Sequence, residues 1–553
     1  MWYEQPAKVF AEALPIGNGR LGAMVFGRTD NETLLLNEDS VWYGDIPSTE
    51  RINPDALKSQ PEIRRLLAEG KVREAERLLR FAVHATPRDQ YPYQPLATLN
   101  IETLNSSGGE ATTGYRRDLD LQTAIGGVRY TRGGTQYLRE VFASFPAQIL
   151  VVRLTAVGTG TLSFAARLSR RPFEGKASRP AVNTVAMEGQ AGPRGPRYAA
   201  LVQAAFQDGG TCEVLGDTLL VEGARSVVLL VAGNTTFRGS KTPKEDGLRQ
   251  FASAKAKGYD ALRAEHIADY QNLHGRVALD LGGDDLSLLP TNKRLERLRT
   301  DKEASDTALE SQFFQYGRYL LIASSRPGSL AANLQGIWND SFTPPWECKY
   351  TININIEMNY WPAEVTNLSE CHGSLFDLIE IARKQGEVVA RKMYDCGGFC
   401  IHHNTTAWGD ATPTGPQVWH FIWPMGGAWL ATHLWEHYLF TRDTKFLQDR
   451  AYPILRDCSR FILDYLYEQP DGTMVTGPGS SPELGFKLPD GYLGGAGLGV
   501  TMDMALAREI FAATLAASET LGKDAALRAE IDSKKKRLAP YRVGKHGQLQ
   551  EWQ

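Results

Sequence analysis

Cysteine, long apolar runs and an excess of charge of either sign are all scarce in this chain. Its 553 residues include six cysteines, and the formal net charge is −3. A nearly neutral chain gives no reason to expect nucleic acid or an anionic membrane as a partner. The sequence also has no apolar run of transmembrane length and no signal-peptide pattern at its start. The composition therefore predicts an ordinary globular protein.

Common catalytic signatures are missing as well. The chain has no G-x-S-x-G, no P-loop and no H-E-x-x-H. Gly17-Asn-Gly-Arg-Leu-Gly22 has the glycines of a phosphate-binding loop, but it precedes a β-rich segment rather than a helix. Cys396 and Cys400 lie near two histidines, yet no second pair has zinc-finger spacing, so unpaired core thiols are the simpler interpretation than zinc. We expect neither a metal nor a cofactor.

The length of the chain predicts two or three domains. Residues 1–240 consist of short β-rich segments separated by glycine-containing turns, which predicts an antiparallel β-sandwich. A helical insertion is expected at 55–82, where apolar residues recur at helical spacing. Residues 241–305 begin as a charged, alanine-rich helical pattern and are predicted to form a linker.

Residues 306–553 are dominated by helical patterns that alternate with loops rich in Gly, Pro, Asn and Asp. The predicted helices are 308–326, 372–394, 424–441, 444–468, 501–522 and 524–538. Loops at one end of paired helices favour an α/α toroid, a scaffold used by carbohydrate-active enzymes. The predicted fold class is therefore multidomain β + α, with a sandwich, a helical linker and a helical toroid.

Isoleucine and asparagine alternate in the middle of residues 350–362. In an extended segment this alternation places Asn353 and Asn355 on one face, with the isoleucines on the other. Glu357 follows directly, and Trp338 and Trp346 precede the segment. Aromatic faces stack on the C–H surfaces of sugars, while amides and carboxylates bind hydroxyls. We interpret the cluster as a sugar-binding site; a buried ladder of structural amides is the alternative.

A second polar and aromatic loop contains His402, His403, Asn404 and Trp408. Adjacent histidines point in different directions on most backbones, so hydrogen bonding to a sugar fits this loop better than a two-histidine metal site. Trp408 would then supply a stacking wall. The alternative interpretation is that these are core histidines and a helix-packing tryptophan.

Glu483 lies in Thr476-Gly-Pro-Gly-Ser-Ser-Pro-Glu-Leu-Gly485, a loop too rich in Gly, Pro and Ser to form a regular element. Hydrolysis of a glycoside with inversion needs an acid on the leaving oxygen and a base that activates water on the opposite face. Glu483 is the best candidate for the acid. A solvated loop glutamate is the alternative.

These motifs, taken in order, resemble those of glycoside hydrolase family 95, the inverting α-L-fucosidases and α-L-galactosidases. The resemblance extends over essentially the whole chain. The matching stretches are residues 13–27, 36–42, 93–96, 334–339, 350–364, 407–410 and 423–429. Several motifs in the expected order make the resemblance specific, whereas each alone would be weak.

The resemblance implies an N-terminal β-sandwich, a helical linker and an (α/α)6 barrel that holds the active site. It implies that Glu483 is the general acid and that Asn353 and Asn355 hold the nucleophilic water. A distant Asp would polarise this asparagine pair. The implied substrate is a fucosylated or L-galactosylated glycan, and the implied location is outside the cytoplasm. Thr351 stands where fucosidases of the family commonly carry His, and Thr there resembles members that prefer L-galactose.

One departure from the family concerns the polarising Asp. In the family it lies beyond the position that matches Gln553, together with the last barrel helices. The resemblance therefore implies that the barrel is incomplete in this chain and gives no ground to expect activity from these residues alone. A non-catalytic carbohydrate-binding protein, or an inactive fragment of such an enzyme, is the alternative to a glycoside hydrolase.

Overall fold

The computed structural model describes residues 1–104, 111–284 and 286–552. The fold divides into two compact units, each assembled from separate stretches of the chain. The first unit comprises Met1–Gly44, Pro92–Cys348 and Val365–Ser374, and the second comprises Asp45–Tyr91, Lys349–Glu364 and Leu375–Gln553.

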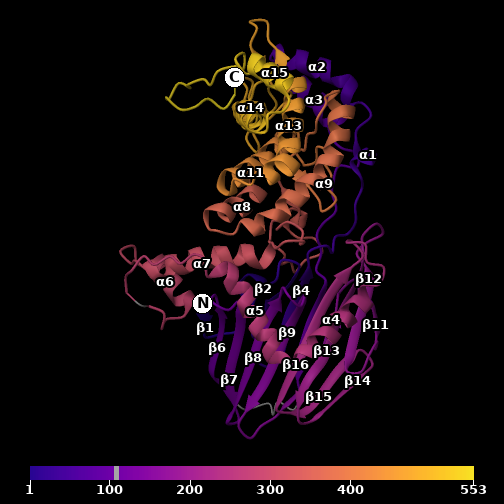
Figure 1. Cartoon of the computed structure of the whole chain (residues 1–553), viewed down its shortest axis with the longest axis vertical. Coiled ribbons are helices and arrows are strands. Elements are labelled where there is room, and N and C mark those ends of the chain that lie inside the picture. Colours follow the sequence, from indigo (N-terminus) through magenta and orange to yellow (C-terminus); the bar gives the residue numbers. More distant parts are fainter. Residues whose placement is uncertain (105–110, 285, 553) are drawn as a thin grey trace. The chain divides into compact units, whose positions relative to one another are not determined.

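Two antiparallel sheets make up most of the first unit (Figure 1). The nine-stranded sheet has the order β1-β6-β7-β8-β9-β16-β13-β12-β11, and the seven-stranded sheet has the order β14-β15-β10-β5-β4-β3-β2. Their strands are Trp2–Tyr3 (β1), Leu14–Gly17 (β2), Leu21–Val25 (β3), Asn31–Glu38 (β4), Ala97–Thr103 (β5), Thr113–Asp120 (β6), Ile125–Arg132 (β7), Thr135–Ser144 (β8), Ile149–Val157 (β9), Leu162–Ser169 (β10), Lys176–Ser178 (β11), Thr184–Gln190 (β12), Arg197–Asp208 (β13), Thr211–Leu215 (β14), Thr218–Ala224 (β15) and Ser226–Thr235 (β16). The prediction of N-terminal antiparallel β-structure is confirmed.

Strand β16 is buried along nearly its whole length rather than on alternate residues. Such a pattern requires cover on both faces of the sheet. Helices α4 (Pro243–Lys257) and α5 (Tyr259–His274) provide this cover on one face, because Phe251 and Leu262 join Leu201 and Leu230 in one apolar cluster. The stretch that we predicted as a helical linker thus contributes to the core of the first unit, and it continues into α6 (Thr291–Thr300).

Helices dominate the rest of the chain, and the predicted helical ranges are confirmed with small shifts at their ends. The helices are Ser48–Arg51 (α1), Ala56–Ala68 (α2), Val72–Leu78 (α3), Thr307–Ser324 (α7), Asn355–Val365 (α8), Ser369–Tyr394 (α9), Val418–Phe421 (α10), Gly426–Thr441 (α11), Thr444–Phe446 (α12), Tyr452–Tyr465 (α13), Thr501–Leu521 (α14) and Ala525–Lys535 (α15). Short strands lie among them at Tyr350–Thr351 (β17), Asn404–Thr405 (β18), Tyr467–Glu468 (β19), Met474–Val475 (β20), Phe486–Lys487 (β21) and Leu493–Gly494 (β22). No helix in the described ranges has the length and apolar character that crossing a membrane requires.

The prediction of an extended segment around the alternating isoleucines and asparagines is wrong. Strand β17 ends at Thr351, a turn follows, and α8 begins at Asn355. Ile352 and Ile356 are 0% and 2% exposed. Residues four apart lie on one face of a helical turn, just as residues two apart share one face of a strand. Ile354, which alternation would also bury, is only half-buried, so five alternating residues were too few to exclude a turn followed by a helix.

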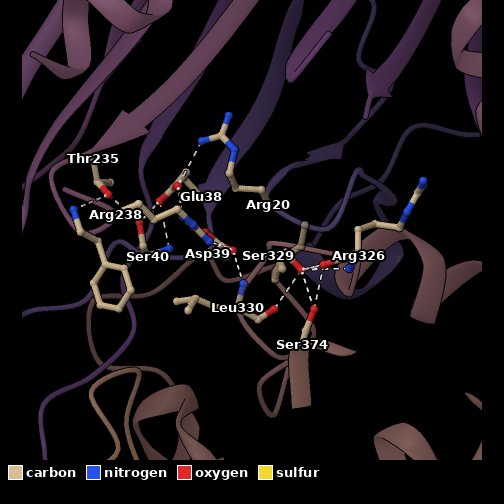
Figure 2. A network of polar contacts seen from close by, with 12 residues as sticks. Arg20, Glu38, Asp39, Ser40, Thr235, Arg238, Arg326, Ser329, Leu330 and Ser374 are labelled. Carbon is tan, nitrogen blue, oxygen red and sulfur yellow. Dashed lines mark hydrogen bonds and ion pairs between the residues drawn. The ribbon is translucent and has the colours of Figure 1, made fainter. Parts of the chain in front are cut away.

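A network of buried charges lies at the end of β4 in the first unit (Figure 2). Arg238 Nη1 lies 3.2 Å from Glu38 Oε1, and its Nη2 lies 2.5 Å from Asp39 Oδ2. Arg20 makes a second contact with Glu38 at 3.1 Å. Burial raises the pKa of Asp39 to about 6, although Arg238 opposes the shift. Two adjacent carboxyl groups are thus held inside the protein by arginines.

Replacing Arg238 with Met should destabilise the first unit by about 2–3 kcal/mol near pH 8. This estimate lies below the ~3–5 kcal/mol for a broken, fully buried pair, because the Arg238 side chain is 32% exposed. The loss should shrink toward pH 5, because Asp39, whose pKa is raised to about 6 in the folded state, gains a proton there and no longer needs a cation. Calorimetric unfolding of both proteins at the two pH values measures the difference.

Arg171→Met is the matched control, because Arg171 is 90% exposed and its contact with Glu174 spans 3.5 Å. An exposed pair of this kind contributes at most ~1 kcal/mol. A loss for Arg238→Met that is no larger than that of the control, or that does not change with pH, would contradict the role of the network.

Candidate active site

Two short strands of the second unit join segments that are far apart in the sequence. Strands β17 and β18 pair in antiparallel fashion, so that Thr351 lies opposite Asn404. The backbone N–H of Ile352 extends the ladder by donating to the carbonyl oxygen of His403 at 2.6 Å. The ladder fixes the histidine-containing loop beside the segment that carries the paired asparagines.

Asn353 and Asn355 follow this ladder directly. Asn353 is 7% exposed, and its Nδ2 donates to Oε1 of Glu483 at 3.2 Å. Asn355 is half-buried and is the first residue of α8. The contact between Asn353 and Glu483 brings a predicted catalytic amide next to the predicted acid, although 130 positions separate them in the chain.

Glu483 has an imidazole within reach as well as an amide. Its side chain is 52% exposed, and its Oε2 lies 4.0 Å from Nε2 of His420, which is in α10. Burial lowers the pKa of His420, and the neighbouring carboxylate only partly offsets this effect. A histidine with a lowered pKa is mainly neutral at pH 7, so Glu483 faces two uncharged polar groups.

The two adjacent histidines differ in what they can do. His402 is fully buried, and its ring nitrogens lie 2.8 Å from the Tyr394 hydroxyl and 2.7 Å from the Ala411 carbonyl oxygen. Burial lowers its pKa to about 4. Both ring nitrogens already have protein partners, so His402 is placed to support the loop rather than to contact a ligand directly.

His403 and Asn404 retain unused hydrogen-bonding atoms. Nδ2 of Asn404 lies 2.7 Å from Nε2 of His403. Burial lowers the pKa of His403 well below its usual value, so the neutral ring accepts this bond through Nε2 and carries its proton on Nδ1. His403 Nδ1, Asn404 Oδ1 and Thr405 Oγ1 are buried and have no partner among the described residues. His403 Nδ1 and Asn404 Oδ1 thus offer a donor and an acceptor, as the hydroxyls of a sugar require.

Glu357 is fully buried on α8, three positions after the turn that precedes the helix. Burial raises its pKa to about 8, although the backbone N–H groups of Glu357 and Ile354 lower it somewhat. Neither carboxyl oxygen has a partner with hydrogen-bond geometry among the described residues. The carboxyl is thus mostly protonated at pH 7 and can donate as well as accept.

The three predicted stacking tryptophans have different surroundings. Trp338 is in the first unit and is 6% exposed, and its indole N–H donates to the carbonyl oxygen of Ile16 at 3.0 Å. Trp346, also in the first unit, is 76% exposed. Trp408 is half-buried in the loop after β18, in the second unit. Only Trp408 belongs to the same unit as the paired asparagines, and the stacking role of all three stays a prediction.

Asp410 stabilises the loop that follows β18 through a buried ion pair. Its Oδ2 lies 3.2 Å from Arg51 Nε, and both side chains are nearly inaccessible. Asp410 also accepts from the hydroxyl of Ser48 at 2.7 Å and from Nε2 of Gln90 at 2.6 Å. Gln90 Nε2 additionally lies 3.4 Å from the carbonyl oxygen of Asn404. The segment Asp45–Tyr91 thus anchors the loop that carries His403 and Asn404.

The two cysteines considered for zinc are both buried in the second unit. Burial raises the pKa of Cys396 to about 12 and holds that of Cys400 well above its usual range. Zinc binds thiolates rather than thiols. Their surroundings therefore favour protonated thiols that pack in the core.

Asp503 is a buried residue near the Glu483 loop that the sequence did not reveal. It is 0% exposed in the first turn of α14, and its Oδ2 lies 3.3 Å from the hydroxyl of Thr476. An aspartate at the start of a helix ordinarily favours the helix dipole. Its sequence position therefore gives no signal of a link to the loop.

Comparisons with known proteins agree with this organisation. The model for the glycosyl hydrolase family 65 N-terminal domain matches residues 1–240, and that for the glycosyl hydrolase family 95 catalytic domain matches residues 258–553. A putative kojibiose phosphorylase from the human microbiome has a similar structure, with a TM-score of 0.61 and 10% identity over 97% of this chain and 69% of that one. At this low identity the structural likeness shows the fold alone.

Curated relatives extend along the whole chain. Alpha-L-fucosidase 2 of Arabidopsis thaliana is 36% identical over 99% of this chain and 68% of its own length. Probable alpha-fucosidase A of Aspergillus niger is 31% identical over 100% of this chain and 72% of its own length. With a catalytic-domain model matched over residues 258–553 and a relative 36% identical along nearly the whole chain, this protein belongs to glycoside hydrolase family 95.

Proposed function

We propose that this protein removes terminal α-L-linked fucose or L-galactose from glycans by a single displacement with inversion, and that Glu483 is the general acid. The 3.2 Å contact between Asn353 and Glu483 carries the proposal, because it joins an amide that can hold water to a carboxyl group that can supply a proton. The curated names of the two fucosidase relatives support fucose as one substrate.

In the proposed reaction the sugar enters between Asn353 and Glu483, so their direct contact breaks when substrate binds. The half-exposed side chain of Glu483 leaves room for this rotation. Glu483 protonates the glycosidic oxygen as the C–O bond breaks, and a water held by Asn353 and Asn355 adds to the anomeric carbon from the opposite face. The proton released by that water replaces the one that Glu483 gave, so one water is consumed per bond.

An amide is a poor proton acceptor unless its oxygen is polarised by a hydrogen-bond network. Such a network must therefore act on the asparagine pair. Thr351, His403 and Asn404 are proposed to bind sugar hydroxyls, since Thr351 and Asn404 are paired across the ladder and unused polar atoms lie beside them. Glu357 and His402, which are fully buried, are proposed to act on the substrate through their neighbours.

Replacing Glu483 with Gln should lower kcat/KM on a fucosylated oligosaccharide by about 10²–10⁴-fold, the usual contribution of a general acid. The loss should be much smaller on an aryl fucoside with an activated leaving group, which needs little protonation. Steady-state kinetics on the two substrates give both numbers. Asp490→Asn, an exposed change elsewhere in the second unit, should leave both rates unchanged. Equal losses on the two substrates for Glu483→Gln would refute the acid role.

Asn353→Ala and Asn355→Ala should each reduce hydrolysis of both substrates, because water must be positioned whatever the leaving group. Circular dichroism and the melting temperature check that each variant folds. Proton NMR during early turnover should show the β-anomer of the released sugar, as inversion of an α-linkage requires. A folded alanine variant with full activity would remove the asparagines from the mechanism, and an α-anomer as first product would exclude inversion.

Thr351→His should shift the preference from L-galactosides toward L-fucosides. The two sugars differ at C6, where fucose has a methyl group and L-galactose has a hydroxymethyl group. A threonine leaves space for the extra oxygen and can hydrogen-bond it, whereas an imidazole would crowd it. The measurement is the ratio of kcat/KM values for the two aryl glycosides. Thr351→Ser, which keeps the hydroxyl and the space, is the control; an unchanged ratio in Thr351→His would show that this position does not read C6.

A further inference from the structure

Asp503 contacts two segments of the second unit. One segment leads to Glu483, the proposed acid, and the other contains His420, its neighbour. Its Oδ1 accepts from the indole N–H of Trp423 at 3.0 Å, and its Oδ2 from the hydroxyl of Thr476 at 3.3 Å. Trp423 follows the short helix that contains His420, and Thr476 begins the loop that contains Glu483. At the far ends of these segments, His420 and Glu483 approach each other to 4.0 Å.

The contacts of Asp503 differ from those of an ordinary helix cap. An acidic residue in the first turn usually faces solvent or accepts from free backbone N–H groups. Asp503 is 0% exposed, and both of its oxygens bind side chains from outside its helix. Burial raises its pKa to about 7, and no cationic side chain of the described residues is among the groups that oppose the shift. Burying a carboxyl group without a cation is unfavourable, so the helix alone does not account for Asp503.

The backbone of the acid loop packs directly on this carboxyl group. A Cβ atom added at Gly479 would lie 2.4 Å from Asp503 Oδ2, so there is no space for a side chain between them. Gly479 and Gly497 exchange two backbone hydrogen bonds, at 2.9 and 2.8 Å. The hydroxyl of Tyr465 donates to the carbonyl oxygen of Pro478 at 2.5 Å. The base of the loop is therefore fixed, and Asp503 forms its floor.

The hydroxyl of Ser480 connects the two segments a second time. It lies 3.2 Å from the carbonyl oxygen of Trp419 and 3.3 Å from that of Ile422. Ser480 lies in the sequence between Gly479, which packs on Asp503, and Glu483. A movement of Asp503 would therefore be transmitted to both segments, and hence to the spacing between Glu483 and His420.

We infer that Asp503 is a positioning residue, which holds the Glu483 loop and the His420 segment so that the acid faces the glycosidic oxygen. The inference rests on the proposed role of Glu483 as general acid. Asp503 touches neither substrate nor water in this scheme and acts only through Glu483. Displacing a catalytic group by about 1 Å can cost on the order of 10²-fold in rate, which is large enough to measure.

The test uses Asp503→Asn and Gly479→Ala in the full chain. The amide oxygen of asparagine can still accept from Trp423. Its NH2 group, however, replaces the oxygen that accepts from Thr476 and that packs on the loop backbone, so these contacts are disturbed. The added methyl at Gly479 pushes the same contact apart from the other side. For each variant we expect kcat/KM on a fucosylated oligosaccharide to fall by roughly 10–100-fold, with a much smaller loss on an activated aryl fucoside.

Thr514→Val is the matched control on the same helix. Thr514 is buried and shares a hydrogen bond of 2.8 Å with Ser459, far along α14 from the loop. If this variant loses activity through reduced stability, it should lose it equally on both substrates. A purely structural role for Asp503 would give the same equal losses, so the ratio of the two substrates separates positioning from folding.

A double variant sharpens the test. When Glu483 is already Gln, Asp503→Asn should cause little further loss, because residues that act as a unit are not additive. Equal losses in both backgrounds, or no dependence on the leaving group for Asp503→Asn and Gly479→Ala, would overturn the inference. If Glu483→Gln itself shows no such dependence, the proposed acid role fails; if it does and the loop variants do not, only the positioning role fails. Should Asp503→Asn not fold, Gly479→Ala and the Thr476→Val change decide by the same ratio.

Discussion

The buried ion pair between Arg51 and Asp410 is the interaction on which the candidate site depends. Neither charge can reach water, so each requires the other, and removing one partner of such a pair costs about 3–5 kcal/mol. Ser48 and Gln90 complete the hydrogen bonding of the aspartate. The loop that carries His403 and Asn404 has almost no regular structure of its own, so the ion pair holds it in place.

From that anchor outward, the site is assembled from short and irregular pieces. Strands β17 and β18 have two residues each, yet their pairing sets Thr351 against Asn404 and leads directly to Asn353. The loop of Glu483 has its own support in the floor formed by Asp503. Buried contacts support both parts, and some polar atoms of the ladder remain without partners among the described residues. Such a division suits a site that must hold its groups in place and still admit a ring of hydroxyls.

Much of the fold was predictable because burial leaves a periodic signal. The strand Ser226–Thr235 and the helix Thr501–Leu521 are long enough for their patterns to be unambiguous. The segment around Asn353 was not, since its alternation covers only five residues and indicated a strand where the chain forms a turn and the start of a helix. The site was predictable only in part. Glu483 and the asparagines stand in distinctive stretches of sequence, and the structure brings Asn353 and Glu483 together.

Other features left no trace in the sequence. Asp503 looks like any aspartate at the start of a helix, and only the fold shows that it lies beneath Gly479. His402 and His403 are neighbours in sequence, yet one has both nitrogens engaged and the other has a free donor. Such differences arise from contacts between distant residues, and a local pattern carries no information about them.

The discontinuity of the second unit has a consequence for how it comes to exist. Ser48 and Asp410 are 362 positions apart, so the segment Asp45–Tyr91 is synthesised long before the loop that it holds. Contacts of such high sequence separation form late and slowly. An excised segment matching residues 258–553 would contain Asp410 without Arg51, Ser48 or Gln90. The stretch matched by the catalytic-domain model and the compact second unit therefore do not coincide, because residues 45–91 belong to that unit and lie outside the matched stretch.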